Sequence, residues 1–385
     1  MSSNGNDRDR AGATDPSGKR RDAESSQRRP ATAEGDGRGS SNLPLYGALD
    51  LGTNNCRLLV ARPSRRGFTV VDAFSRIIRL GEGVSRTGRL SDAAMGRTLD
   101  ALAVCAAKLK PGRVRRSRLV ATEACRIAAN GADFLSEVHR RTGLELEVLS
   151  REEEAKLAVS GCAALLDSRA ELVLVFDIGG GSSELIWLDL ARDGAGAGRS
   201  VGERLEVRNC IVGWTSLPVG VVTLAERYGG RDVTAGTFEC MVGDVCTLLA
   251  PFEAEGRYRE RLQGARAHLL GTSGTVTTVA GVHLGLPRYE RSRVDGCWMR
   301  VSQARAVTER LLDSTYEERV AQPCIGRDRA DLVLAGCAIL EAVVRTWPCD
   351  ELRVADRGLR EGILASLMAE DGFDRGTRHR PENQR

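Results

Sequence analysis

One stretch of sequence decides the fold: ELVLVFDIGGGSSELIWLDL, residues 171–190. Two apolar runs flank a turn of glycines and serines, which predicts a strand, a tight turn and a second strand. Three consecutive glycines leave their backbone N–H groups unobstructed, and such groups form a concave site for an anion. Asp177 ends the first strand, where a carboxylate is costly unless it has a function. The alternative is a flexible turn with solvated acids.

This turn predicts a phosphate site with a metal ion. Mg²⁺ binds few protein carboxylates and keeps water and phosphate oxygens as its other ligands. Asp177 and Glu184, which follows seven residues later, are the predicted metal ligands. The residues of this turn predicted to bind phosphate are Gly179, Gly180, Gly181, Ser182 and Ser183.

A second stretch repeats the pattern, and it reads LYGALDLGTNNCRLLVA at residues 45–61. Asp50 and Asp177 both end an apolar strand, 127 residues apart, and both precede a small polar turn. Two such hairpins indicate a duplicated α/β domain with a cleft between the halves. An ordinary hairpin turn is the alternative. The residues predicted to bind phosphate here are Gly52, Thr53, Asn54, Asn55 and, in the returning strand, Arg57.

A third glycine turn, GTSGT at residues 271–275, follows the apolar run AHLLG and opens a helical pattern. It lacks the lysine of a P-loop and does not match the dinucleotide fingerprint. Because a helix N-terminus binds phosphate well, the turn is a candidate nucleotide site. A plain strand-to-helix connection is the alternative. The candidate residues are Gly271, Thr272, Ser273 and Gly274.

The rest of the chain predicts alternating strands and helices. Ser91 is the predicted N-cap of a helix over 91–109. Ser150 and Glu153 form a capping-box pattern that opens a helix ending near 166. Strands are also predicted over 68–80 and 145–150, and a strand that leads into a loop and helix over 118–126. Helices are predicted over 302–313 and 328–346, and a strand, loop and helix over 351–369. The glycine-rich segment 191–207 is predicted to be a hairpin loop.

Composition narrows the functional classes. The 385 residues are 42% hydrophobic and 28% charged, with a net charge of +4, so nothing favours nucleic acid as a partner. No apolar run reaches the ~18 residues of a transmembrane helix, and no signal-peptide core opens the chain. We therefore expect a cytoplasmic protein that does not bind membranes. The eleven cysteines form no CxxC pair and the four histidines lack zinc-finger spacing, which argues against structural zinc.

Composition also suggests where the folded part lies. Residues 1–41 and 371–385 are predicted to be disordered tails, because they hold too few large apolar residues to offset the entropy of ordering. Between them we expect domain I over 43–166 and domain II over 167–356. The C-terminal helix at 357–370 is expected to pack back onto domain I.

Several motifs, taken in order, resemble the exopolyphosphatase/guanosine-pentaphosphate phosphohydrolase (Ppx/GppA) family. They are DLGTNNCR (50–57), TEACR (122–126), SREEEAKL (150–157), DIGGGSSEL (177–185), LPVGVVTL (217–224), LLGTSGTVTTVAG (269–281), RADLVLAGCAIL (329–340) and DRGLREGIL (356–364). The resemblance implies an α/β fold of two actin-like (ribonuclease H-like, ASKHA) domains with an interdomain cleft. It also implies Mg²⁺ as cofactor. Many relatives carry serine at the position of Asn55, and an amide still donates a hydrogen bond.

The resemblance further implies roles for single residues. Glu154 matches the family's catalytic base. Asp177 and Glu184 match its acids near the metal, and Arg57 and Arg126 match arginines that hold phosphate. The pattern alone offers another explanation for Glu154, because acids in the first turn of a helix favour the helix dipole. Arg126 could instead pair with Glu123 across a helical turn.

The predicted function is Mg²⁺-dependent hydrolysis of a terminal phosphoanhydride, in inorganic polyphosphate (exopolyphosphatase), in pppGpp, or in both. Two other classes stay open at this point. One is a small-molecule kinase of the same superfold, and the other is a non-catalytic alarmone or nucleotide sensor. The sequence also leaves open whether the protein is a homodimer.

Overall fold

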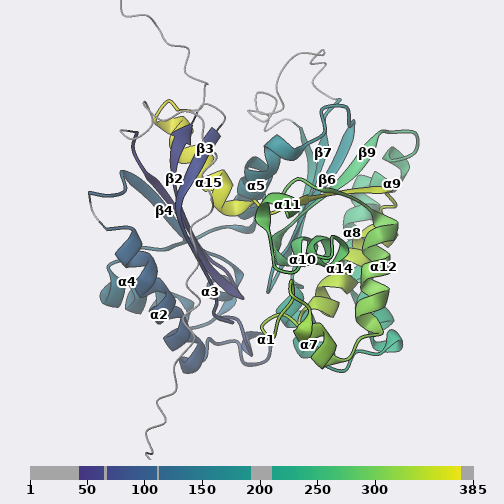
Figure 1. The fold of residues 1–385 in the computed structure, drawn as a ribbon, viewed down its shortest axis with the longest axis horizontal. Coiled ribbons are helices and arrows are strands. Elements are labelled where there is room, and N and C mark those ends of the chain that lie inside the picture. Colours follow the sequence, from purple (N-terminus) through teal and green to yellow (C-terminus); the bar gives the residue numbers. More distant parts are fainter. Residues whose placement is uncertain (1–42, 65–66, 111, 192–209, 374–385) are drawn as a thin grey trace, which may run out of the picture. The chain divides into compact units, whose positions relative to one another are not determined.

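The strands form two mixed sheets, which Figure 1 shows with their helices. The computed structural model describes residues 43–64, 67–110, 112–191 and 210–373. The first sheet has the order β3-β2-β1-β4-β5, in which β2 and β3 run antiparallel to their neighbours and β4 and β5 run parallel to β1. Its strands are β1 (Tyr46–Leu51), β2 (Asn55–Ser64), β3 (Gly67–Ile77), β4 (Arg116–Ala121) and β5 (Glu147–Val148).

The second sheet has the order β10-β11-β9-β6-β7-β8. Its three central strands β11, β9 and β6 are parallel, and β10, β7 and β8 are antiparallel to their neighbours. The strands are β6 (Leu172–Ile178), β7 (Ser183–Asp189), β8 (Ile211–Leu217), β9 (Ala267–Thr272), β10 (Trp298–Arg300) and β11 (Glu351–Ala355).

Helices connect the strands and cover both sheets. They are α1 (Val84–Thr87), α2 (Asp92–Lys108), α3 (Glu123–Ile127), α4 (Gly131–Thr142), α5 (Arg151–Cys162), α7 (Val221–Tyr228), α8 (Ala235–Gly256), α9 (Tyr258–Arg261), α10 (Ser273–His283), α11 (Arg291–Val294), α12 (Val301–Leu312), α13 (Tyr316–Ala321), α14 (Val333–Thr346) and α15 (Leu359–Glu370).

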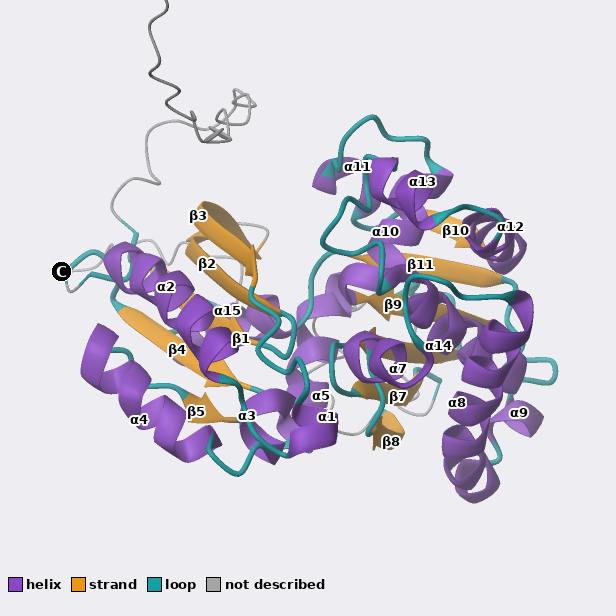
Figure 2. Ribbon diagram, turned by 90° about the horizontal axis from the view of Figure 1, so that it is seen from below, coloured by secondary structure: helices purple, strands orange, loops and turns teal. Residues whose placement is uncertain are grey.

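Alternation along β1 explains why both faces of the first sheet are covered. Leu49 and Leu51 share one core with Leu102 of α2. Tyr46 and Ala48 point to the other face, where they pack in a core built by α15. Figure 2 shows α2 and α4 lying on the same face of the sheet, and the two helices contact each other.

The second sheet follows the same rule along β6. Leu174 and Phe176 belong to the large core that α8, α10, α12 and α14 complete. Val173 and Val175 face the opposite side and pack with Val159 of α5. A parallel strand that is buried on both faces needs a continuous apolar run, and LVLVF supplies it.

Helices α5 and α15 join the two sheets by packing against each other, as Figure 1 shows. Their contact is too close for side chains. A Cβ on Gly161 would lie 1.9 Å from the carbonyl oxygen of Gly358, and one on Gly362 would lie 2.0 Å from that of Leu157. The C-terminal helix therefore packs back on β1 and at the same time contacts α5.

The two glycine hairpins have the same register, which confirms the 127-residue repeat. Asp50 pairs with Arg57 across the first hairpin, and Asp177 pairs with Glu184 across the second. In both turns the glycine two residues after the aspartate donates its N–H to the carbonyl three residues on, at 2.9 Å in the first and 3.0 Å in the second. The position opposite the aspartate is therefore a cation, Arg57, in the first hairpin and an acid, Glu184, in the second.

The predicted helix starts are largely correct. Ser91 accepts the N–H of Ala94 at 3.3 Å, and Ser150 accepts that of Glu153 at 3.2 Å. The reciprocal half of the capping box is absent, because the Glu153 carboxylate bonds Arg118 instead. Helix α5 ends at Cys162, and the chain continues to residue 165 as a short 3-10 turn, close to the predicted end.

Two predicted boundaries are wrong. Helix α14 begins at Val333 rather than near 328, because Gly326 has φ 69° and the residues after it form turns. The C-terminal tail was expected from 371, but Asp371 accepts a hydrogen bond from Tyr46 Oη at 2.6 Å and Phe373 packs edge-on against the same ring. The predicted tail 1–41 and all but the first residue of the predicted loop 191–207 lie outside the described residues.

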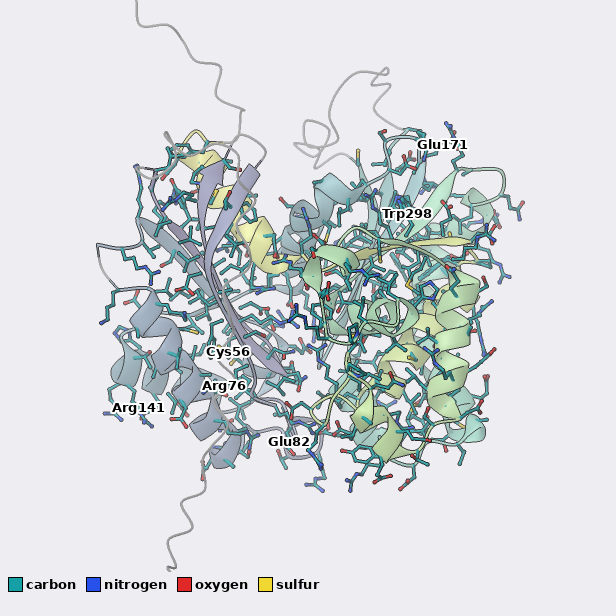
Figure 3. The ribbon with its side chains drawn as sticks, in the orientation of Figure 1. Cys56, Arg76, Glu82, Arg141, Glu171 and Trp298 are labelled. Atoms are coloured by element: carbon teal, nitrogen blue, oxygen red, sulfur yellow. The ribbon has the colours of Figure 1, made fainter. Side chains whose placement is uncertain are left out.

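Most cysteines in the described part of the chain are buried free thiols. Cys56, labelled in Figure 3, is one of them, with its Sγ 3.9 Å from that of Cys105 in α2. Across the described residues, no helix combines the length and apolar character that a membrane crossing needs.

Candidate active site

The glycine turns of the two sheets line one cavity, which also takes in the start of α5 and the start of α15. Most of the residues singled out from the sequence line it. They are Gly52, Thr53, Asn54, Asn55, Arg57, Glu154, Asp177, Gly179, Gly180, Gly181, Ser182, Glu184, Thr272 and Ser273. Arg126, Ser183, Gly271 and Gly274 do not line it.

The first turn is held from behind by the segment after β3. The Asn54 carbonyl accepts the N–H groups of Ile78 and Arg79 at 2.9 and 3.1 Å, and the Thr53 carbonyl accepts that of Gly81 at 2.9 Å. Asn54 is only 8% exposed, yet its Oδ1 has no hydrogen-bond partner in the described part of the chain. A buried polar atom without a partner is costly, so this oxygen is available to accept a hydrogen bond from a donor in the cavity.

The second turn packs against the first and is supported by α7. A Cβ on Gly180 would lie 3.0 Å from Thr53 Cβ, so only glycine lets the two turns approach. The carbonyls of Gly179 and Gly180 accept the N–H groups of Val221 and Val222 at 3.0 and 2.9 Å. With its carbonyls fixed on the α7 side, the turn can present its N–H groups to an anion.

Glu154 differs from the two other acids in the first turn of α5. The Glu152 and Glu153 side chains are 51% and 45% exposed and pair with Lys156 and Arg118 at 2.5 Å each. The Glu154 side chain is 15% exposed and lines the cavity beside the second glycine turn. Stabilisation of the helix dipole therefore accounts for its neighbours but not for its own orientation.

Arg126 links Glu154 to a buried acid. Its Nη2 lies 3.0 Å from Glu154 Oε2 and 2.7 Å from Glu123 Oε2, and its Nη1 bonds the Leu149 carbonyl at 2.5 Å. The alternative of a pair with Glu123 across a helical turn is thus correct, and the arginine also reaches the candidate base. As the structure stands, Arg126 positions carboxylates behind the cavity wall.

The cavity concentrates buried carboxyls whose charges disfavour one another. Burial, and then the charge of Asp177, raises the pKa of Glu184 to about 7. Burial also raises the pKa of Asp177 to about 6. The pKa of Glu154 lies well above its ordinary value because of burial and then the charge of Glu184. Such values suit a proton acceptor that works near neutral pH.

The carboxyl groups of the second hairpin could supply one or two ligands to a divalent cation. Within the described ranges, no group of three or more His, Cys, Asp and Glu side chains is arranged to hold a metal ion. Asp177 and Glu184 nevertheless pair across the hairpin, Asp177 partly buried and Glu184 fully, and burial is the main reason that the pKa of each is raised. Mg²⁺ needs only one or two carboxylates when phosphate and water complete its shell, so this pair is compatible with Mg²⁺.

The third turn contributes less than expected. Gly271 lies inside β9, where a Cβ would be 2.6 Å from the Phe176 ring, so its role is packing. Thr272 and Ser273 line the cavity but use their hydroxyls on the carbonyls of Arg357 and Ile178. Gly274 lines a smaller adjoining cavity, whose wall includes Arg329. Ser183 of the second turn is likewise turned away, and its hydroxyl donates to the Val219 carbonyl.

Several cavity residues were not predicted. Asp50 lines it and is partly buried among charged groups, with burial raising its pKa. Glu123 lines it too; burial alone would raise its pKa, but hydrogen bonds from Arg151 and Arg126 outweigh burial and lower it. The motif DRGLREGIL brings Arg360 and its neighbours to the same wall. The signal for Asp50 was its place at a strand end, which was noted for the repeat but not used for the site.

The fold and site define a class: two linked α/β sheets that present paired glycine turns and several acids to one cavity. The model of the Ppx/GppA phosphatase family matches residues 59–371, most of the chain. The chain belongs to the Ppx/GppA phosphatase family. The predicted fold class of two actin-like domains is thereby confirmed, because solved structures of this family share the fold.

Two of the relatives that match this chain are named as different hydrolases. A guanosine-5'-triphosphate,3'-diphosphate pyrophosphatase of Aeromonas hydrophila is 30% identical over 85% of this chain, and the match spans 60% of that protein. The exopolyphosphatase 2 of Mycobacterium tuberculosis is 29% identical over 84% of this chain and 99% of its own length.

Two solved structures show the same fold over most of the chain. A crystal structure of an exopolyphosphatase-like protein is 30% identical, with a TM-score of 0.72 over 85% of this chain and 99% of that one. The Ppx/GppA family member of Aquifex aeolicus is 27% identical, with a TM-score of 0.67 over 86% of this chain and 99% of that one.

Proposed function

We propose that this protein hydrolyses the terminal phosphoanhydride of inorganic polyphosphate, of pppGpp, or of both, with Mg²⁺ as cofactor. One observation carries the proposal: Glu154 lies in a cavity wall beside the glycine turns, away from bulk solvent, while its neighbours in the helix pair at the surface. The two kinds of named relative support both substrates.

The turns would bind the terminal phosphate from two sides. Backbone N–H groups of Gly180 and Gly181 are the candidate donors in the second turn, because the Gly179 N–H bonds the Ser182 carbonyl and the Ser182 hydroxyl bonds Glu184. The amide of Asn55 and the guanidinium of Arg57 are candidates in the first. Phosphoryl transfer depends mainly on positioning and on offsetting charge, which this set provides.

Glu154 would accept a proton from, or orient, the attacking water. A carboxylate with a raised pKa is a better proton acceptor near neutral pH than one with an ordinary value. Arg126, at 3.0 Å, fixes the direction of the carboxylate. Asp177 and Glu184 would hold Mg²⁺, which when bound offsets negative charge on the phosphoryl oxygens.

The deciding experiment compares phosphate release from short polyphosphate, long polyphosphate and pppGpp, with and without Mg²⁺, using the full chain. We expect release from at least one substrate and a strong requirement for Mg²⁺. ADP-dependent transfer to a small acceptor without phosphate release would instead identify a kinase. Tight binding of ppGpp with no hydrolysis of any of these compounds would identify a sensor, and either result would overturn the proposal.

Mg²⁺ should stabilise the protein more at higher pH. Asp177 and Glu184 keep their protons in the folded state up to pKa values of about 6 and about 7, above their ordinary values. Their contribution to stability is therefore fully present below the unfolded pKa of ~4 and is lost as pH rises through about 6 to 7. Mg²⁺ binds the ionised carboxylates and offsets that loss.

Thermal melts with and without Mg²⁺ test this expectation. The rise in Tm caused by Mg²⁺ should be larger at about pH 8 than at about pH 6, because more of both carboxylates is ionised. The double variant Asp177→Asn, Glu184→Gln should lose the Mg²⁺-induced rise at both values. An equal rise in the double variant would show that the ion binds elsewhere.

A further inference from the structure

Arg360, the second residue of α15, lines the cavity that both glycine turns share. It makes no hydrogen bond and no ion pair with any residue in the described ranges. Other arginines around it are paired: Arg291 donates to Glu361 at 2.8 Å, and Arg357 bonds Asp295. Arg360 is therefore set apart from the structural ion pairs at this end of α15.

The backbone around Arg360 is fixed by close packing. The Gly358 carbonyl lies where a Cβ on Gly161 would be, and Gly362 contacts the backbone of Leu157 in the same way. The Arg357 carbonyl accepts hydrogen bonds from the hydroxyl of Thr272 and the thiol of Cys162, at 2.8 and 3.0 Å. These contacts leave the first turn of α15 no freedom to carry the guanidinium away from the cavity.

The charges around Arg360 leave it without a full counter-charge. Its nearest acid in sequence, Glu361, is engaged by Arg291 and by the N–H of Gly358 at 2.9 Å. Asp50 is the other acid whose charge acts on Arg360, and the charge of Arg57 acts on Asp50 as well. Burial lowers the pKa of Arg360, and the charge of Arg57 lowers it further.

Two neighbouring guanidinium groups thus act on the same acid, Asp50, while Arg57 also acts on Asp177. Arg57 enters the cavity from β2 and Arg360 from α15, and neither has a hydrogen-bond partner in the parts of the chain that are described. A partly buried cation without a hydrogen-bond partner is costly, and a bound anion would lower that cost. The planar fork of a guanidinium matches two oxygens of a phosphate group.

Building on the function proposed above, we propose that Arg360 binds substrate. Together with Arg57 it forms a two-arginine clamp whose N–H groups donate to non-bridging oxygens of the terminal phosphate. The clamp approaches from the first sheet and α15, whereas the second glycine turn approaches from the other sheet. Inorganic phosphate, which presents the same oxygens, should bind the same clamp.

The test measures phosphate affinity and substrate kinetics in the full chain. Arg360→Gln should weaken binding of inorganic phosphate, measured by calorimetry, about 10-fold or more, and should raise KM for short polyphosphate by a similar factor. Arg360→Lys should recover part of the loss, because lysine keeps the charge but not the fork. Arg305→Gln is the control, since Arg305 pairs with Glu341 on an exposed surface away from the cavity.

Thermal melts without phosphate separate substrate binding from a structural role. Arg360→Gln should melt no lower than the parent protein, because the variant removes a partly buried cation that has no hydrogen-bond partner in the described part of the chain. A lower Tm with unchanged phosphate affinity and KM would assign Arg360 to the structure and overturn the clamp. Should the glutamine variant fail to fold, the lysine variant decides, and parent-like affinity and KM in it would also overturn the clamp.

The outcomes distinguish this inference from the proposed function. Phosphate binding that depends on Arg360, in a protein that hydrolyses none of the three substrates, would support the clamp and refute the function. Hydrolysis whose rate and KM do not change when Arg360 is replaced would support the function and refute the clamp.

Discussion

Glu154→Gln is expected to lower the turnover number for phosphate release by about 100-fold or more, the range typical for loss of a general base. Glutamine keeps the size of the side chain and its contact with Arg126, so substrate affinity should change little. Repulsion with Glu184 disappears, and the Tm should stay level or rise. Initial rates with a saturating substrate and Mg²⁺, together with thermal melts, measure both effects.

Glu152→Gln is the matched control for this variant. Glu152 sits in the same helical turn, but its side chain is 51% exposed and pairs with Lys156. Its removal should leave turnover within about twofold, because exposed pairs contribute little to stability. If Glu154→Gln were as active as this control, Glu154 would not act on the water.

Gly220→Ala is expected to distort the second glycine turn and to abolish most phosphate release. The added methyl would lie 2.4 Å from the carbonyl carbon of Gly180, 2.5 Å from its oxygen and 2.6 Å from the Gly179 oxygen. These are backbone atoms of the predicted phosphate loop, so they cannot move aside as a flexible side chain would. Gly220 has φ −139°, which alanine also adopts, so the whole effect is steric.

Overpacking of this kind costs about 1–3 kcal/mol of folding free energy, which urea unfolding measures. Gly243→Ala in α8 is the control, because nothing lies within 4 Å of its added methyl. That substitution should stabilise the helix by about 0.5–1 kcal/mol and leave activity unchanged. A Gly220→Ala protein with parent-like stability and turnover would mean that the turn adapts and that its backbone is not the phosphate cradle.

The parts of the site that the sequence predicts correctly depend only on residues close to one another in the chain. A strand, a small turn and a returning strand fix Asp177 opposite Glu184 whatever the rest of the molecule does. The same holds for Asp50 and Arg57 in the first hairpin. Ser150 marks the helix start that positions Glu154.

The parts that could not be read depend on contacts between distant segments. Gly271 looked like a loop glycine, but β9 runs through it and the Phe176 ring occupies the space beside it. Ser183 closely follows the glycines of the second turn, as a phosphate-binding residue would, yet strand alternation directs its hydroxyl to the Val219 carbonyl. Arg360 joins the site because α15 returns to β1. The return of the helix was expected, but no local pattern indicated that Arg360 would face the cavity.

The return of α15 has a consequence for synthesis on the ribosome. The core on its side of the first sheet combines Tyr46 and Ala48 with Ile363 and Leu367, and Tyr46 bonds Asp371, 325 residues away. A nascent chain that has emerged only as far as β11 holds this apolar face of the sheet without α15, which supplies Ile363 and Leu367 to the core. Such surface promotes aggregation in slow-folding chains, so the amino-terminal half should depend on chaperones until α15 has emerged.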